Sequence, residues 1–279
     1  MVIVITSIII MLILASLTFH ELNHAIVMRK CGVPVEKIGV LGWPFLWAVK
    51  LPIRHSLFPE TEWLIHPFTF MLGAYVKVSR IDIEALSSRE RLQIWGAGPL
   101  SNISFAILLY GILLFATEMN TFGGSIAGFQ LILSIFIAWS LLKYQRFICN
   151  KYVLLPLVVG SVCVTAYSLT LHTPNANIDS GLSDFVAQMY NYGIRIEHYP
   201  VYLQIASVMK ISALLSLMIG VVNFLPLMPL DGGRIVNEFV PISWRKLYSQ
   251  ISMPFIIIML LFMIGKDIWN LTEFVRSFI

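Results

Sequence analysis

Long apolar stretches that carry no charged residue alternate with polar segments along the chain. These stretches cover residues 1–19, 92–117, 119–142, 152–178, 211–230 and 247–265. A membrane-spanning helix needs about 20 mostly apolar residues, and a helix suits the bilayer core because it satisfies its own backbone hydrogen bonds. The pattern therefore predicts an all-α polytopic membrane protein with about six transmembrane helices. The alternative is five spans, with one apolar stretch lying in the membrane interface.

Two segments between the apolar stretches are long enough to hold structure of their own. Residues 31–90 contain only short apolar runs, and residues 75–78 alternate weakly between apolar and polar, as a strand does. Residues 173–202 are predicted to form a polar external loop, and residues 120–124 a tight turn between the second and third spans. Since no repeat or linker divides the chain, a single membrane-embedded domain over residues 1–279 is expected.

The first apolar stretch has two interpretations, a signal peptide or an uncleaved span. It lacks both a basic N-terminal region and a small-residue cleavage site, and ionisable residues follow it directly. These features favour an uncleaved first span.

Composition and charge narrow the class of protein. The chain is 58% apolar and 12% charged, whereas soluble domains are about 45–50% apolar and about 25% charged. This excludes an ordinary soluble enzyme and a nucleic-acid-binding protein. If the segment after the first span is cytoplasmic, fifteen Lys and Arg residues lie inside and four outside, namely Arg195, Lys210, Lys266 and Arg276. The positive-inside rule then places both termini outside the cytoplasm. The three cysteines indicate neither a disulfide framework nor a cysteine metal site.

The first apolar stretch leads directly into His20-Glu-Leu-Asn-His24. Residues four apart share one face of a helix, so both imidazoles can reach one metal ion, and the Glu21 carboxylate lies beside it as a base for water. This spacing is expected by chance only about 0.005 times in a chain of this composition. Because ionisable residues within a span are costly, the motif indicates function rather than two interfacial histidines with a snorkelling Glu.

A catalytic zinc normally takes three protein ligands, so a third is needed. The other histidines fall in predicted loops or at the ends of spans: His55, His66, His172 and His198. Asp231 is the best carboxylate candidate, because it follows an apolar stretch that Pro226 and Pro229 interrupt, and broken helix at membrane depth is tolerated where it lines a cavity. The alternative is that Asp231 only caps the next helix.

Together these motifs resemble the site-2 protease family of intramembrane zinc metalloproteases, and most closely its branch that cleaves bacterial anti-sigma factors. Besides the histidine motif, the resemblance rests on residues 29–36 (RKCGVPVE), 72–77 (LGAYVK), 96–102 (GAGPLSN) and 223–233 (NFLPLMPLDGG). It implies one Zn²⁺ per chain held by His20, His24 and Asp231, with Glu21 activating water. It also implies a bacterial inner-membrane protein whose active site faces the cytoplasm and whose substrates are transmembrane helices, for example an anti-sigma factor or a signal-peptide remnant.

The resemblance also implies where a substrate binds. Residues 35–80 would supply a small membrane-associated β-hairpin whose edge, at Tyr75 and Val76, pairs with an unwound substrate strand. Asn223 would hold the substrate backbone. The pattern alone equally allows a loop strand on the cytoplasmic side and an Asn223 that satisfies the interrupted helix. Asn102 and Ser101 could line a polar cavity or could simply let helices pack closely.

The chain departs from the family pattern at several points. The PDZ module between the second span and the Asp-Gly motif is missing, and a pair of spans over residues 119–172 takes its place beside the family core at 1–117 and 205–240. Asn23 and Ala74 stand where many members have glycine. None of these changes removes a metal ligand or the base.

Three functions remain open at the level of sequence. The first is a zinc endopeptidase acting on transmembrane substrates within the lipid bilayer. The second is an inactive membrane scaffold of the same fold. The third is an ion-coupled transporter, although neither repeated topology nor charges in several spans are visible. No nucleic-acid partner is expected, and the oligomeric state stays open.

Overall fold

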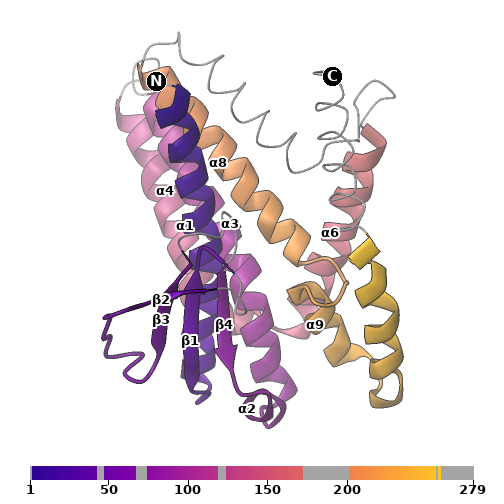
Figure 1. The fold of residues 1–279 in the computed structure, drawn as a ribbon. Helices are drawn as coiled ribbons and strands as arrows, with labels where there is room; N and C mark the ends of the chain where they lie inside the picture. Colours follow the sequence, from indigo (N-terminus) through magenta and orange to yellow (C-terminus); the bar gives the residue numbers. More distant parts are fainter. Residues whose placement is uncertain are drawn as a thin grey trace, which may run out of the picture.

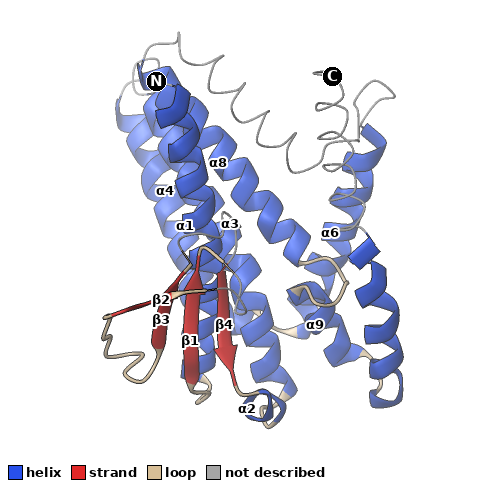
Figure 2. Ribbon diagram, in the orientation of Figure 1, coloured by secondary structure: helices blue, strands red, loops and turns tan. Residues whose placement is uncertain are grey.

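The computed structural model describes residues 2–42, 47–66, 74–118, 124–171, 201–255 and 257–258. The described chain is mostly helical, with one small sheet near the lower end of the bundle (Figure 1, Figure 2). The helices are α1 (Val2–Lys30), α2 (Arg80–Glu84), α3 (Ser88–Glu118), α4 (Gly124–Lys143), α5 (Gln145–Ile148), α6 (Lys151–Leu171), α8 (Val201–Asn223) and α9 (Asp231–Phe239). A further helical stretch covers residues 242–255.

Three of the described helices are long and apolar enough to cross a membrane. They are Ser7–Lys30 in α1, Ser88–Phe115 in α3 and Leu203–Asn223 in α8, and they match the first, second and fifth predicted spans. The apolar parts of α4 and α6 are helical but shorter, at Gly128–Lys143 and Lys151–Cys163. The six-span count therefore stays a prediction. The predicted turn at 120–124 lies largely outside the described residues, as does the predicted external loop at 173–202.

Helix α3 is the centre of the bundle. It packs along α8, α4 and α1, and it also contacts α9. In Figure 1 the helices α1, α3, α4 and α8 stand close together, while α6 and α9 lie to the other side. Small residues allow this close packing: a Cβ on Gly220 of α8 would come within 3.1 Å of the Pro99 carbonyl oxygen of α3.

The end of α1 is set by Gly32. Its φ of 82° lies in the left-handed region that glycine tolerates without strain. The Val33 N–H donates to the Met28 carbonyl over 2.9 Å, and the Gly32 N–H to the Arg29 carbonyl over 3.1 Å. These two bonds form a Schellman motif, which satisfies carbonyls that the helix end leaves open. Helix α1 thus extends beyond its apolar stretch and carries the histidine motif on regular helix.

The segment after α1 forms a four-stranded sheet, where the sequence predicted a small β-hairpin. Its strands are β1 (Val35–Val40), β2 (Val49–Leu51), β3 (Glu62–Ile65) and β4 (Ala74–Val78), in the order β2-β3-β1-β4. Strand β1 pairs in parallel with β3 and antiparallel with β4. The hairpin prediction missed β2 and β3, because runs of three and four residues are too short to show an alternating pattern.

Ion pairs connect three of the strands. The Glu62 carboxylate of β3 lies 2.7 Å from the Lys50 ammonium of β2 and 3.0 Å from that of Lys37 on β1. Hydrogen bonds from Lys50 and Lys37, and their charges, lower the pKa of the Glu62 carboxyl to about 2. The group is exposed, so solvent screens these pairs and the register depends mainly on the strand hydrogen bonds.

Candidate metal centre

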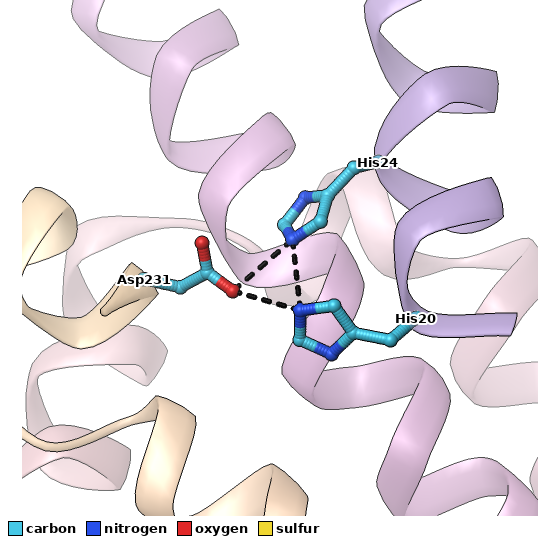
Figure 3. Close-up of side chains that lie close together, drawn as sticks. All are labelled: His20, His24 and Asp231. Carbon is cyan, nitrogen blue, oxygen red and sulfur yellow. Dashed lines mark hydrogen bonds and ion pairs between the residues drawn. The ribbon is translucent and has the colours of Figure 1, made fainter. Parts of the chain in front are cut away.

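Helices α1 and α9 bring three predicted residues together. His20 and His24 lie one turn apart on α1, and Asp231 is the first residue of α9. Figure 3 shows the two imidazoles and the carboxylate pointing toward one another. The two Nε2 atoms lie 3.1 Å apart, and each is 3.1 Å from Oδ2 of Asp231. All three residues are buried, with at most 6% of their surface exposed.

The approach of Asp231 depends on the interruption after α8. Helix α8 ends at Asn223, and Pro226 and Pro229 prevent regular helix before α9 begins. A Cβ on Gly232 would overlap the Phe224 carbonyl group, so glycine is needed there for the start of α9 to pack against this segment. Leu230, rather than Asp231, occupies the N-cap position of α9. The alternative that Asp231 serves as the helix cap is therefore not supported.

Helix α3 orients both imidazoles. The Nδ1 of His24 donates to the Ile94 carbonyl over 2.6 Å, which leaves the lone pair on Nε2 directed at Asp231. The Trp95 ring packs edge-on at 6.4 Å between ring centroids. The Nδ1 of His20 lies 3.1 Å from the side-chain amide of Asn102, which is fully buried.

Gly98 of α3 has no side chain, and this keeps open the space that the two imidazoles face. A Cβ built on Gly98 would overlap Nε2 of His20 and Nε2 of His24. The sequence showed Gly98 only as part of the motif at 96–102. Its role here could not be predicted, because it depends on which face of α3 lies against α1.

The donor set fits a zinc ion. Two imidazole nitrogens and a carboxylate oxygen are the ligands of many catalytic zinc sites, and bonds of about 2.05 Å in a tetrahedron separate ligand atoms by about 3.3 Å. The observed separations are 3.1 Å. Three acceptor atoms at this spacing need protons or a cation between them, and Gly98 keeps that space clear. Within the described ranges, this is the one group of His, Cys, Asp or Glu side chains placed to hold a metal.

Glu21 is half-buried beside this group. Its carboxylate is close enough to interact electrostatically with His20, His24 and Asp231, and also with Arg234 of α9. This places it where the motif predicts the base to be. In the part of the chain that the structure describes, no hydrogen bond or ion pair joins it to the three residues.

Asn23 fixes α1 against α3 in a way the sequence did not predict. Its amide donates to the Ala97 carbonyl over 2.6 Å and to Oε1 of Gln145 over 3.0 Å. Both side chains are buried. By resemblance, Asn23 is only a departure from the glycine of many family members. Gln145 lies in a short polar stretch between apolar runs, which carries no signal of this contact.

The predicted substrate-contacting residues lie on other elements than the three buried residues. Tyr75 and Val76 are on β4, an edge strand of the sheet, and Asn223 is the last residue of α8. Among the described residues, none of the hydrogen bonds of the metal-binding group involves them. The Tyr75 hydroxyl instead lies 3.3 Å from Nε2 of His66, whose Nδ1 is 2.9 Å from the Trp47 carbonyl oxygen. His172 and His198 lie outside the described residues.

Comparison with known proteins identifies the family of the chain. A sequence model of Peptidase family M50 matches residues 8–265. A candidate zinc metalloprotease of Neisseria meningitidis serogroup A is 34% identical over 141 residues, covering 42% of this chain and 29% of that protein. Protease RseP of Yersinia pestis is 32% identical over 106 residues, covering 34% of this chain and 22% of that protein. The chain thus aligns with less than a third of each of these relatives. The family match spans nearly the whole chain and confirms the resemblance seen in the motifs: the chain belongs to Peptidase family M50.

Proposed function

We propose that the chain is a zinc endopeptidase that hydrolyses peptide bonds in or near the transmembrane helices of membrane-protein substrates. The observation that carries the proposal is the convergence of His20, His24 and Asp231 within 3.1 Å of one another. Membership of a peptidase family and the names of the two relatives support it. The whole chain would act as one membrane-embedded domain.

In this proposal His20, His24 and Asp231 hold one zinc ion through Nε2, Nε2 and Oδ2. When bound, the zinc supplies a Lewis acid that activates water and polarises the scissile carbonyl group. Glu21 takes the proton from the attacking water and returns it to the leaving amide nitrogen. The three ligands are buried, and exclusion of bulk water strengthens the electrostatic interactions at such a site.

A transmembrane helix hides its peptide bonds in its own hydrogen-bond ladder, so cleavage requires local unwinding. The free edge of β4, with Tyr75 and Val76, would pair with the unwound strand. Asn223, at the end of α8, would hold the substrate backbone as it enters. By the charge distribution, the site would face the cytoplasm from a bacterial inner membrane, with both termini on the opposite side. Anti-sigma factors and signal-peptide remnants are the substrates that the resemblance implies.

A transmembrane reporter assay tests the proposed activity. The purified chain is placed in proteoliposomes with a panel of reporters, each carrying one apolar helix, and the products are mapped by mass spectrometry. We expect a cut in or near the apolar helix that stops after chelation and returns when zinc is added. Failure of the zinc-loaded chain to cut any reporter would favour the inactive scaffold.

Replacing Gly98 with Ala is expected to weaken zinc binding by at least about tenfold, because the new methyl group occupies the space between the two imidazoles. Gly160→Ala is the matched control, since a Cβ there meets no atom within 4 Å. Titration of zinc against a fluorescent chelator measures both variants. Equal affinity in Gly98→Ala and Gly160→Ala would show that the metal does not sit in this space.

A further inference from the structure

A large cavity opens beside the metal-binding group. It has a volume of about 1300 Å³ and lies between β4, α3, α9 and the helical stretch after residue 241. Tyr75, Val76, Lys77 and Val78 of β4 line one side of it. Strand β4 pairs only with β1 in the described sheet, so its other edge is available to a further strand.

The cavity begins next to the metal-binding group. Arg234, one turn after Asp231 on α9, lines the cavity and stacks on the Trp95 ring at 4.5 Å. The same Trp95 ring packs against His24. The guanidinium of Arg234 is also within electrostatic reach of Glu21. A substrate strand paired with β4 would therefore lie in a cavity that Arg234 and Trp95 connect to the metal-binding group.

Basic side chains exceed acidic ones in the lining. The lining includes five Lys and Arg residues and two Glu residues, Glu84 and Glu238. Glu238 is already engaged, since Arg91 donates to both of its carboxylate oxygens over 2.8 Å. Lys77 pairs with Glu36 at 3.3 Å. Among the described residues, neither Arg234 nor Lys246 has a carboxylate within ion-pair distance, so both cations are available to a ligand.

We propose that this cavity selects substrates that carry Asp or Glu in the strand beside the cleaved bond. The strand adds to the free edge of β4, which has five residues and so accommodates about five residues of substrate. Arg234 and Lys246 bind the acidic side chain. The inference rests on the proposed endopeptidase function, and it names the substrate class by its charge.

Three matched reporters test this selectivity. One carries Glu beside the apolar helix, a second carries Gln there and a third carries Lys, and kcat/KM is measured in proteoliposomes of zwitterionic lipid. We expect the wild type to prefer the Glu reporter over the Gln reporter by about two- to fivefold, the upper part of the range for an exposed charge pair. Lys246→Glu should remove this preference and favour the Lys reporter. Lys151→Glu, at an exposed position on α6 outside the cavity, should behave as the wild type.

The outcomes separate this inference from the proposed function. If the wild type cuts Glu and Gln reporters equally and Lys246→Glu changes nothing, the endopeptidase stands and the charge selection is wrong. If Lys246→Glu instead changes the rate on all three reporters equally, and only when anionic lipid is present, the cavity binds a lipid headgroup and the proposal is overturned. A peptide with the sequence of the Glu reporter should bind to the Glu21→Gln variant. It should no longer bind to the double variant Glu21→Gln/Arg234→Gln. This comparison tests the contact without turnover.

A second, independent observation concerns a buried hydrogen-bond network behind His20. Ser16 of α1, Asn102 of α3 and Ser216 of α8 are each at most 1% exposed. The Ser216 hydroxyl donates to the Asn102 backbone carbonyl over 2.9 Å. The hydroxyls of Ser16 and Ser216 lie 2.7 Å apart, so Ser16 must donate its single proton to Ser216. Ser16 then has no proton left for Oδ1 of Asn102, the atom that lies 3.4 Å from its hydroxyl oxygen.

We infer that Asn102 is a positioning residue for His20. Because Ser16 can only accept, the amide NH₂ of Asn102 faces Ser16 and its carbonyl oxygen faces Nδ1 of His20, an orientation reached by a half-turn of the amide. Nδ1 then carries the proton and donates over 3.1 Å, and Nε2 presents its lone pair to the metal. The network thus fixes the tautomer of His20 that a zinc ligand requires.

Zinc affinity, measured by chelator competition, tests this role without turnover. We expect Asn102→Ala to weaken zinc binding about 10- to 100-fold, and Asn102→Asp, which keeps an acceptor for Nδ1–H, to restore most of it. Ser104→Ala is the control, since this buried hydroxyl of α3 donates only to the Leu100 carbonyl. With the opposite amide orientation, Asn102→Ala would release Nδ1 and tighten zinc binding. That result, or no change, would overturn the inference.

Discussion

Glu21→Gln is expected to slow cleavage of a transmembrane reporter by about 100- to 10,000-fold while one zinc per chain is retained. The amide has nearly the shape of the carboxylate but cannot take a proton from water. Glu21 is not among the three residues whose ligand atoms converge, so replacing it should leave the metal in place. The measurement combines reporter cleavage with zinc analysis of the same purified sample.

Glu60→Gln serves as the matched control for this prediction. Glu60 is exposed in the turn before β3 and is not one of the residues that converge at the metal-binding group. The Glu60→Gln variant should cleave the reporter at the wild-type rate. If Glu21→Gln retains more than about a tenth of the wild-type rate, water is activated by another group and the role given to Glu21 is wrong.

Removing a ligand should instead remove the metal. Asp231→Ala and His24→Ala are each expected to weaken zinc binding by more than about 100-fold, since loss of an outer-shell partner alone costs about 10- to 100-fold. Cleavage should fall with zinc occupancy. Zinc titration together with thermal unfolding of each variant separates loss of metal from loss of fold.

Two controls make the ligand prediction specific. His55→Ala changes an exposed histidine of the sheet region and should bind zinc as the wild type does. Asp231→Ser keeps a residue suited to the start of a helix but removes the carboxylate. If Asp231→Ser kept full zinc affinity, Asp231 would be serving only the helix start, and the third ligand would be elsewhere.

The local part of the site could be predicted from the sequence. Two histidines four apart share a helix face whatever surrounds them, so His20 and His24 follow from spacing alone. Asp231 could be found because a carboxylate beside an interrupted apolar stretch is costly unless it has a partner. Its proximity to the histidines, 3.1 Å across more than 200 residues of sequence, needed the structure.

The remaining features depend on packing that no local pattern encodes. Helix α8 begins at Val201, ten residues before the predicted span, because a single Lys210 ends a charge-free stretch without ending a helix. The parallel pairing of β1 with β3 joins segments that show no pairing signal in the sequence. The roles of Gly98, Asn102 and Gln145 depend on which face of one element meets which face of another.

X-ray absorption at the zinc edge tests the central claim most directly, since it reports the ligands of the metal in the purified chain. The geometry predicts one zinc per chain bound by two imidazole nitrogens and at least one oxygen ligand, with the spectrum altered in Asp231→Ala. A chain that takes up no zinc, or a zinc spectrum that is the same in the wild type and in Asp231→Ala, would contradict the assignment of His20, His24 and Asp231 as the metal centre.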